Sequence, residues 1–174
     1  MTNVRVRVAF GPATVTVSSE PCTDVGTPAD DVVLLTETCD DRDTLTRIEI
    51  WQESFPKQVV MLHWQPVPYG AESVSVHFEP STRTLFVGAG TFAAAVHLPS
   101  RTIRDEHEIF VFWGFEAIGD YVLELGELDV FLRDREGRIV AKASVDPPYE
   151  FTRTPEGIRL NAGAYGEQWL RFPC

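Results

Sequence analysis

The sequence lacks two features on which membrane and nucleic-acid proteins depend. No stretch approaches the roughly 18 uninterrupted apolar residues that cross a bilayer as a helix. Positive charge is in deficit, with 15 Lys and Arg against 26 Asp and Glu and a net charge of -11. Because nucleic acids and anionic lipids attract basic surfaces, we expect neither a nucleic-acid nor a membrane partner.

Cysteine is scarce as well. Cys22, Cys39 and Cys174 are widely spaced and form no CxxC pair, so they do not indicate a disulfide framework or a zinc site. Free thiols fit a reducing compartment, and the alternative is one bridge between Cys22 and Cys39. The residues after Met1 lack the apolar run of a signal peptide. These observations predict a cytoplasmic protein.

No segment keeps an apolar period of 3.6 residues for three turns, so any helix is short. Apolar residues instead alternate with polar ones in short runs, and turn residues separate the runs every 8 to 12 residues or so. This pattern predicts an all-β fold of about a dozen short antiparallel strands, arranged as a sandwich or as stacked meanders. The length predicts one domain over residues 1–174. The predicted runs are 4–8, 15–17, 32–35, 48–51, 59–64, 74–78, 85–87, 92–98, 109–113, 121–125, 128–132, 139–145, 158–160 and 169–172.

Bulky apolar residues are densest between residues 107 and 140. Three runs, 109–113, 121–125 and 128–132, follow one another with short breaks, and a turn at 134–137 leads into a fourth. We expect this stretch to form the centre of the core, with Trp64, Trp113 and Trp169 buried in their apolar runs.

A strand, a charged four-residue turn and a second strand occur at 78–88 and again at 132–140, and residues 154–160 repeat the second half. This rhythm resembles the blades of propeller-like β-repeat proteins of bacteria, in the manner of WD-like or quinoprotein-like repeats. The resemblance covers residues 74–172 and implies a small or open propeller as the alternative architecture. It carries no Trp-Asp dipeptide and no fixed repeat interval.

Motifs for catalysis, cofactors and metals are also missing. There is no G-x-S-x-G elbow, no dinucleotide fingerprint around Gly88 and Gly90, and no HExxH or H-x-H spacing among the four histidines. The sequence therefore predicts no catalytic residue, no cofactor and no metal. Carboxylates such as Glu124 and Glu127 are expected on the wet face of a one-sided sheet. The alternative is a ligand-binding or hydrolytic cleft formed by His77, His97, Glu124 or Glu127.

The most acidic segment is the best candidate for contact with a partner. Acidic loops steer towards basic surfaces, and an exposed aromatic pair would supply apolar area. We therefore predict a non-enzymatic β domain that binds a protein partner, such as an acidic inhibitor or immunity-type protein with a basic target. A structural domain that self-associates through strand edges is a further alternative. The predicted contact residues are Asp30, Asp31, Asp40, Asp41, Asp43, Trp51 and Phe55.

Overall fold

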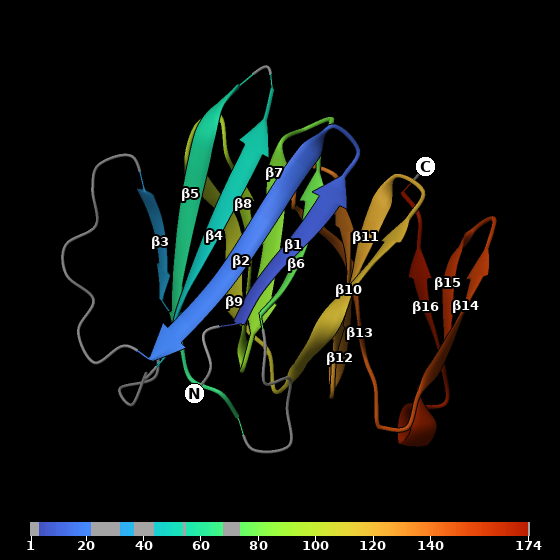
Figure 1. Cartoon of the computed structure of the whole chain (residues 1–174). Coiled ribbons are helices and arrows are strands. Elements are labelled where there is room, and N and C mark those ends of the chain that lie inside the picture. The colour runs from blue at the N-terminus through green and yellow to red at the C-terminus, as the bar shows by residue number, and fades with distance from the viewer. Residues whose placement is uncertain (1–3, 22–31, 37–43, 54, 68–73, 174) are drawn as a thin grey trace.

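The fold was determined as a computed structural model, which describes residues 4–21, 32–36, 44–53, 55–67 and 74–173. Over these residues the chain forms sixteen strands and one short 3-10 helix, η1 (Gly163–Tyr165). The strands make four sheets that stand side by side in an open row (Figure 1). The predicted all-β class is confirmed, and the meanders are stacked rather than closed into a ring.

The first sheet, sheet A, is the largest and the least regular. Its strand order is β1, β2, β4, β5, β3, and β3 runs parallel to β5. The prediction of purely antiparallel pairing is therefore wrong for β3, because this strand returns to the outer edge of the sheet instead of continuing the hairpin. The strands of sheet A are β1 (Val4–Phe10), β2 (Ala13–Pro21), β3 (Val32–Thr36), β4 (Thr44–Gln52) and β5 (Phe55–Trp64).

Sheets B, C and D are antiparallel meanders in simple chain order. The predicted turns at Gly11-Pro12, 80–83, 134–137 and 154–157 all join paired strands. Sheet B has β6 (Ser75–Glu79), β7 (Thr84–Ala89), β8 (Phe92–His97) and β9 (Thr102–Glu108). Sheet C has β10 (Phe112–Ile118), β11 (Tyr121–Gly126), β12 (Asp129–Asp134) and β13 (Ile139–Ser144). Sheet D has β14 (Glu150–Thr154), β15 (Gly157–Asn161) and β16 (Glu167–Arg171).

Two strands were not predicted from the sequence, and the first three residues of one predicted strand form a loop. β9 and β14 are rich in charged residues and lack an apolar run, so alternation does not reveal them. Residues 109–111 form a loop before β10, although they belong to an apolar run. The two stretches that resemble each other, 78–88 and 132–140, occupy different positions in their sheets: the first lies in β6 and β7, the second in β12 and β13.

The core lies between the sheets. The largest apolar cluster joins sheets A and B and includes Trp64, Phe78 and Leu85, while a second cluster joins sheets C and D and includes Leu123 and Ile158. The prediction that 107–140 is the centre of the core is therefore wrong. Its side chains divide between two interfaces because alternate residues of a strand point to opposite faces of the sheet.

Sheet B is covered on both faces. Every residue of β7 is buried, and so are five of the six residues of β8. Gly88, Ala93 and Ala95 lie on the face towards sheet C, where they leave room for the rings of Phe112 and Phe115. A Cβ atom at Gly88 would overlap the Phe112 ring. The alanine-rich run at 92–98 is thus a strand whose small side chains admit the aromatic rings of the neighbouring sheet.

Among the described residues, the structure contains no helix of the length and apolarity that a bilayer crossing requires.

Candidate functional site

A group of polar and charged side chains, two of which are fully buried, connects sheets B and C. Glu124 on β11 and Arg133 on β12 are both fully buried, and Arg133 Nε donates to Glu124 Oε2 at 2.7 Å. Arg133 Nη2 donates to Asp105 Oδ2 on β9 at 2.8 Å, and Nη1 donates to the carbonyl oxygen of Gly137 at 2.7 Å. His107, also on β9, lies 2.8 Å from Glu124 Oε1 through its Nε2 atom. We call these four side chains the B–C ion network.

Strand register explains why these residues meet. Val122 faces Arg133 across the β11–β12 pair, and Glu124 faces Phe131, so Glu124 and Arg133 share one face of sheet C. Asp105 and His107 are two residues apart on β9 and share the facing side of sheet B. The prediction that Glu124 lies on a wet face is therefore wrong. Its face was assigned correctly, but a neighbouring sheet covers that face.

The geometry of the network indicates a structural clasp. Two carboxylates contact one guanidinium and one imidazole, and the His107 ring also packs on Phe131 with 4.5 Å between ring centroids. Satisfied buried charges of this kind fix the contact between two elements more than they add stability. In the described part of the chain, no group of three or more His, Cys, Asp or Glu side chains has the arrangement of a metal site.

The residues of the predicted cleft take up separate positions. His77 lies between Phe10 and Phe86, with ring centroids 5.6 and 5.8 Å away, and burial lowers its pKa. The ring of His97 contacts Ser100 Oγ at 2.6 Å; burial and then the charges of Arg104 and Arg83 lower its pKa. Glu124 belongs to the B–C ion network, and Glu127 lies in the β11–β12 loop. Glu124 thus pairs with His107, a histidine outside the predicted cleft.

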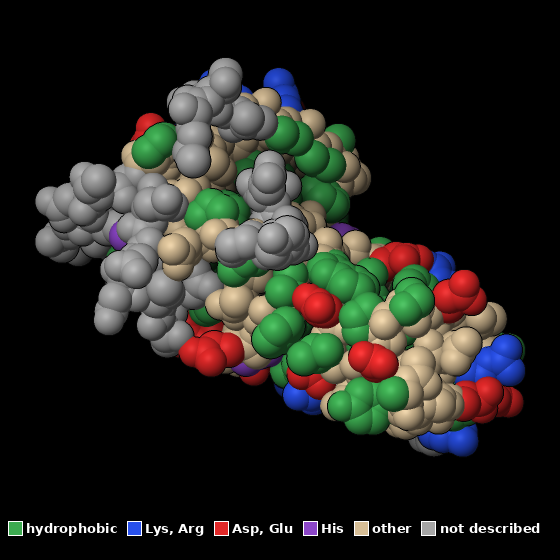
Figure 2. Space-filling view, turned by 90° about the horizontal axis from the view of Figure 1, so that it is seen from below, with side chains coloured by type: hydrophobic (Ala, Val, Ile, Leu, Met, Phe, Trp, Pro, Cys, Tyr) green, Lys and Arg blue, Asp and Glu red, His purple; other side chains and the backbone are tan. Residues whose placement is uncertain are grey.

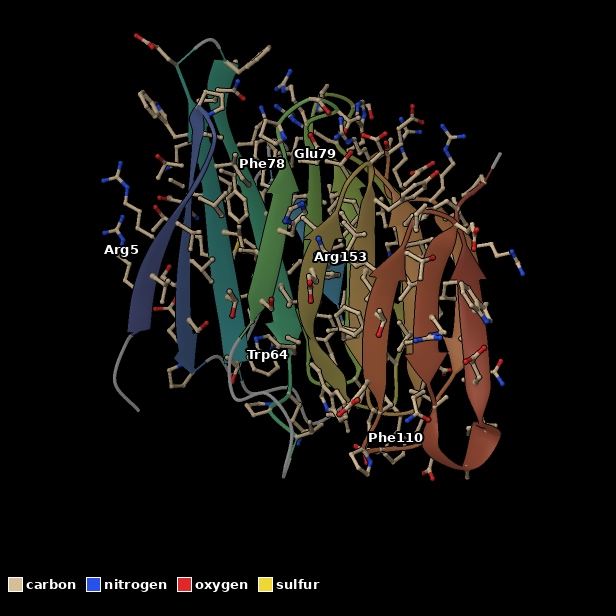
Figure 3. The ribbon with its side chains drawn as sticks, turned by 90° about the vertical axis from the view of Figure 1, so that its right-hand side faces the viewer. Arg5, Trp64, Phe78, Glu79, Phe110 and Arg153 are labelled. Atoms are coloured by element: carbon tan, nitrogen blue, oxygen red, sulfur yellow. The ribbon has the colours of Figure 1, made fainter. Side chains whose placement is uncertain are left out.

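The opposite end of the molecule from the Gly11-Pro12 turn, the lower end in Figure 1, carries an exposed apolar patch. Phe110 is 60% exposed, Trp113 43% and Leu128 38%. The Trp113 ring stacks on Tyr149 with centroids 5.2 Å apart and an interplanar angle of 7°. We call these four residues the lower-end patch; Figure 3 labels Phe110 at this end. The prediction that Trp113 is buried is wrong, whereas Trp64 is buried as predicted.

Three loops hold the lower-end patch in place. The amide of Glu127 donates to the carbonyl of Val111 at 2.9 Å. The amide of Val145 donates to the carbonyl of Leu128, also at 2.9 Å. The Tyr149 hydroxyl donates to the carbonyl of Gly126 at 2.8 Å, and burial raises the pKa of Tyr149, so it stays a neutral donor. The patch is therefore a preformed surface, which reduces the entropy lost on binding.

Carboxylates are close to the patch residues in the sequence. Glu108, Glu127 and Glu150 each lie within two residues of a patch residue in the sequence, and the chain has no Lys or Arg between Arg104 and Arg133. Seen from below, hydrophobic side chains gather over this end with acidic side chains among them (Figure 2). An apolar centre with an acidic margin suits a partner surface that is apolar in the middle and basic around it.

Comparisons with known proteins add little to this geometry. No protein-family model matches the chain, and no curated protein matches it. Among solved structures, the fold is similar to BamB from Moraxella catarrhalis, with a TM-score of 0.44 and 7% sequence identity. The match covers 89% of this chain and 39% of the BamB chain, so this chain spans well under half the length of that protein.

Of the predicted contact residues, the structure describes Trp51 and Phe55, and both lie apart from the lower-end patch. Asp30, Asp31, Asp40, Asp41 and Asp43 fall outside the described residues. Trp51 is 53% exposed near the upper end of sheet A. It pairs with Thr14, whose neighbours Ala13 and Val15 point into the core, so Trp51 points outwards.

Phe55 lies on the other face of sheet A from Trp51. It lines a small hollow with Phe78 and Leu98, and the guanidinium of Arg83 lies 3.6 Å from its ring centroid. Arg83 of the β6–β7 turn therefore covers part of the Phe55 ring, and 38% of the residue stays exposed.

The lower-end patch was not predicted from the sequence, because Phe110 and Trp113 belong to an apolar run that was interpreted as a buried strand. One signal was present in the sequence. Five consecutive apolar residues at 109–113 cannot all point to one side of a strand, so some of them had to face a second apolar layer or solvent.

Proposed function

We propose that this chain is a protein-binding β domain without an enzymatic activity of its own, and that the lower-end patch binds a basic protein partner. An acidic inhibitor or immunity-type protein for a basic target is the concrete form of this proposal. The observation that carries it is the cluster of Phe110, Trp113 and Leu128, exposed together on fixed loops that contain carboxylates and no basic side chain.

The physical argument concerns how protein interfaces gain affinity. Contiguous exposed apolar area costs solubility and marks interaction sites on soluble proteins. Large aromatic side chains at the centre of an interface supply most of the binding energy, while charges at the margin raise the association rate and select the partner. Phe110 and Trp113 fit the first role, and Glu108, Glu127 and Glu150 fit the second. A cytoplasmic setting, expected from the sequence, belongs to the same proposal.

Affinity capture from the native host's lysate at low and high salt tests the proposal. The patch variant carries Phe110→Ser and Trp113→Ser; the matched control carries Trp51→Ser, which removes an exposed aromatic side chain at the other end. We expect the wild type and the control to retain one stoichiometric basic protein at low salt. The patch variant should lose it, because truncating a central aromatic anchor costs about 2 kcal/mol or more, a weakening of about 30-fold.

High salt separates the contribution of the aromatic side chains to binding from that of the carboxylates. The attraction between these carboxylates and basic groups of the partner extends over about 10 Å at 0.1 M salt and about 3 Å at 1 M salt. Binding of the partner should therefore weaken or disappear at the higher salt concentration. A third variant, Asp40→Asn with Asp41→Asn and Asp43→Asn, asks whether the acidic segment predicted from the sequence also contributes. Retention of the same partner by the patch variant would disprove the proposal, as would the absence of any stoichiometric partner of the wild type.

A further inference from the structure

The first strand of the chain is a sheet edge that is open to solvent. β1 stands at the end of the strand order in sheet A and pairs only with β2 among the described residues. Residues 5–9 are all exposed, which means that neither face of this part of the strand is covered. Val6 is 48% exposed and Val8 37%, although their partners Val17 and Val15 are buried.

The two faces of β1 differ in chemistry. Val6 and Val8 share the inner face of sheet A with Val15 and Val17, whereas Arg5 and Arg7 share the outer face with Ser18 and Thr16. Arg5 points away from the body of the molecule (Figure 3). No ion pair of Arg5 or Arg7 occurs within the part of the chain that the structure describes. The edge thus offers apolar contact on one side and, on the other, two arginines that form no ion pair with the described residues.

β1 is also the most regular of the edge strands. It pairs over seven residues without a register shift. In contrast, register shifts interrupt the pairing of β9, one edge of sheet B, and of β10 and β13, the two edges of sheet C. The remaining edge strands, β3, β6, β14 and β16, have only five residues each. Bulges and short length are two of the devices that protect edges from pairing, and β1 has neither; its protection is limited to the charges of Arg5 and Arg7.

We propose that β1 is a site for strand addition, and that its occupant is an extended segment of a partner protein with alternating apolar and acidic residues. Backbone hydrogen bonds to the free edge would supply affinity. The apolar side chains would lie beside Val6 and Val8, and the carboxylates beside Arg5 and Arg7, because neighbouring strands place side chains of one face together.

A second copy of this chain fits the edge poorly. Full-length antiparallel pairing of β1 with another β1, centred on Val6 or on Arg7, matches the valine faces and places arginine opposite arginine. Like charges opposite each other on neighbouring strands are destabilising. This argument selects an acidic segment over self-association, and the site is independent of the lower-end patch and of the function proposed for it.

Synthetic peptides test the site directly. Two fluorescein-labelled peptides, EVEVEVE and KVKVKVK with blocked ends, are titrated with the full chain and followed by fluorescence anisotropy. We expect the glutamate peptide to bind at least ten times more tightly than the lysine peptide, and the preference to weaken with salt. Arg5→Glu with Arg7→Glu should reverse the preference. A matched control, Arg159→Glu with Arg171→Glu on sheet D, changes the net charge by the same amount. This control should keep the preference for the glutamate peptide.

Amide hydrogen exchange places the peptide on the molecule. Bound glutamate peptide should slow exchange in the segment that contains β1. The patch variant Phe110→Ser with Trp113→Ser should bind the peptide as the wild type does, so failure of one proposal leaves the other standing. The strand-addition site is disproved if neither peptide binds, if both bind equally, if the Arg5/Arg7 variant keeps the glutamate preference, or if exchange in β1 does not change.

Discussion

Glu124 and Arg133 form a charge pair in the middle of an interface between two sheets. Taking a carboxylate and a guanidinium out of water costs several kcal/mol each, and only good geometry recovers this cost. Here each charged group has more than one partner: Glu124 meets Arg133 and His107, and Arg133 also reaches Asp105 and the carbonyl of Gly137. The contacts of Glu124 with His107 and of Arg133 with Asp105 therefore connect sheet C to sheet B.

Replacing one member of this buried pair should lower the free energy of unfolding far more than replacing one member of an exposed ion pair. We expect Glu124→Gln to lower the free energy of unfolding by about 3–5 kcal/mol, because it leaves Arg133 buried without its main counter-charge. The double variant Glu124→Leu with Arg133→Met should cost less than the sum of the two single changes. Urea unfolding followed by fluorescence measures these values.

The pair of Glu116 and Arg153 provides the control. Its atoms are 2.7 Å apart, but both side chains are substantially exposed. Glu116→Gln should therefore change stability by less than about 1 kcal/mol. Equal losses for Glu116→Gln and Glu124→Gln would contradict the structural role assigned to the B–C ion network.

His77 gives the molecule a pH dependence of a defined sign. Burial lowers its pKa in the folded chain, and the charge of Glu79 opposes this only in part. Above the unfolded-state pKa of about 6.5, both states hold a neutral ring and His77 adds no pH dependence. Below it, the unfolded chain binds a proton that the folded chain does not, so stability is lost as the pH falls.

We therefore expect His77→Phe to flatten the fall in stability between about pH 7 and pH 5. Phenylalanine keeps the contacts with Phe10 and Phe86 and removes the titrating group. Urea unfolding of both proteins at a series of pH values measures the two slopes. Identical slopes would show that His77 does not titrate differently in the two states.

At the scale of elements, sheet B packs between two other sheets, with sheet A on one face and sheet C on the other. Its face towards sheet C is lined by Gly88, Ala93 and Ala95, and the aromatic rings of sheet C enter the space that they leave. Close packing of this kind tolerates little added volume. The alanine-rich composition of β8 thus follows from its neighbours rather than from strand propensity.

Gly88→Ala should lower the free energy of unfolding by about 1–3 kcal/mol, because the added methyl group would overlap the Phe112 ring. Gly114→Ala, also in a strand, adds a methyl group with no atom within 4 Å and should change stability by less than about 0.5 kcal/mol. Thermal unfolding followed by circular dichroism compares the two. Equal stability of Gly88→Ala and Gly114→Ala would contradict close packing between Gly88 and the Phe112 ring.

At the scale of the whole molecule, four sheets in a row create two chemically different places for partners. The lower end collects loops with exposed aromatic residues and carboxylates, and the first edge strand carries exposed valines and arginines. The overall charge of -11 conceals this difference, because it averages an acidic end and a locally basic edge. Net charge therefore excludes classes of partner but does not locate a binding surface.

The prediction of one domain over residues 1–174 stays a prediction. Apolar clusters join sheets A and B and sheets C and D, while the contact between B and C combines small apolar clusters with the B–C ion network. Separating sheets B and C would expose Phe112 and Glu124 to water, both of which are fully buried.

The sequence by itself determined the all-β class, the turns and most of the strands. Alternation at 74–78 and turn residues at 80–83 and 134–137 are local signals, and local backbone geometry is what they control. The same local signals gave the correct face for His77 and for Glu124. They missed β9 and β14, whose charged residues are held in strands by pairing with their neighbours.

Only the tertiary structure decided what each face meets. Alternation separates two faces of a strand but does not reveal that a second sheet covers the polar one, as it does for Glu124 and His77. It likewise did not show that Phe110 and Trp113 leave the core, or that β3 lies parallel to β5. Burial is a property of how sheets stack, which depends on residues far apart in the chain, and both proposed binding surfaces arise from that stacking.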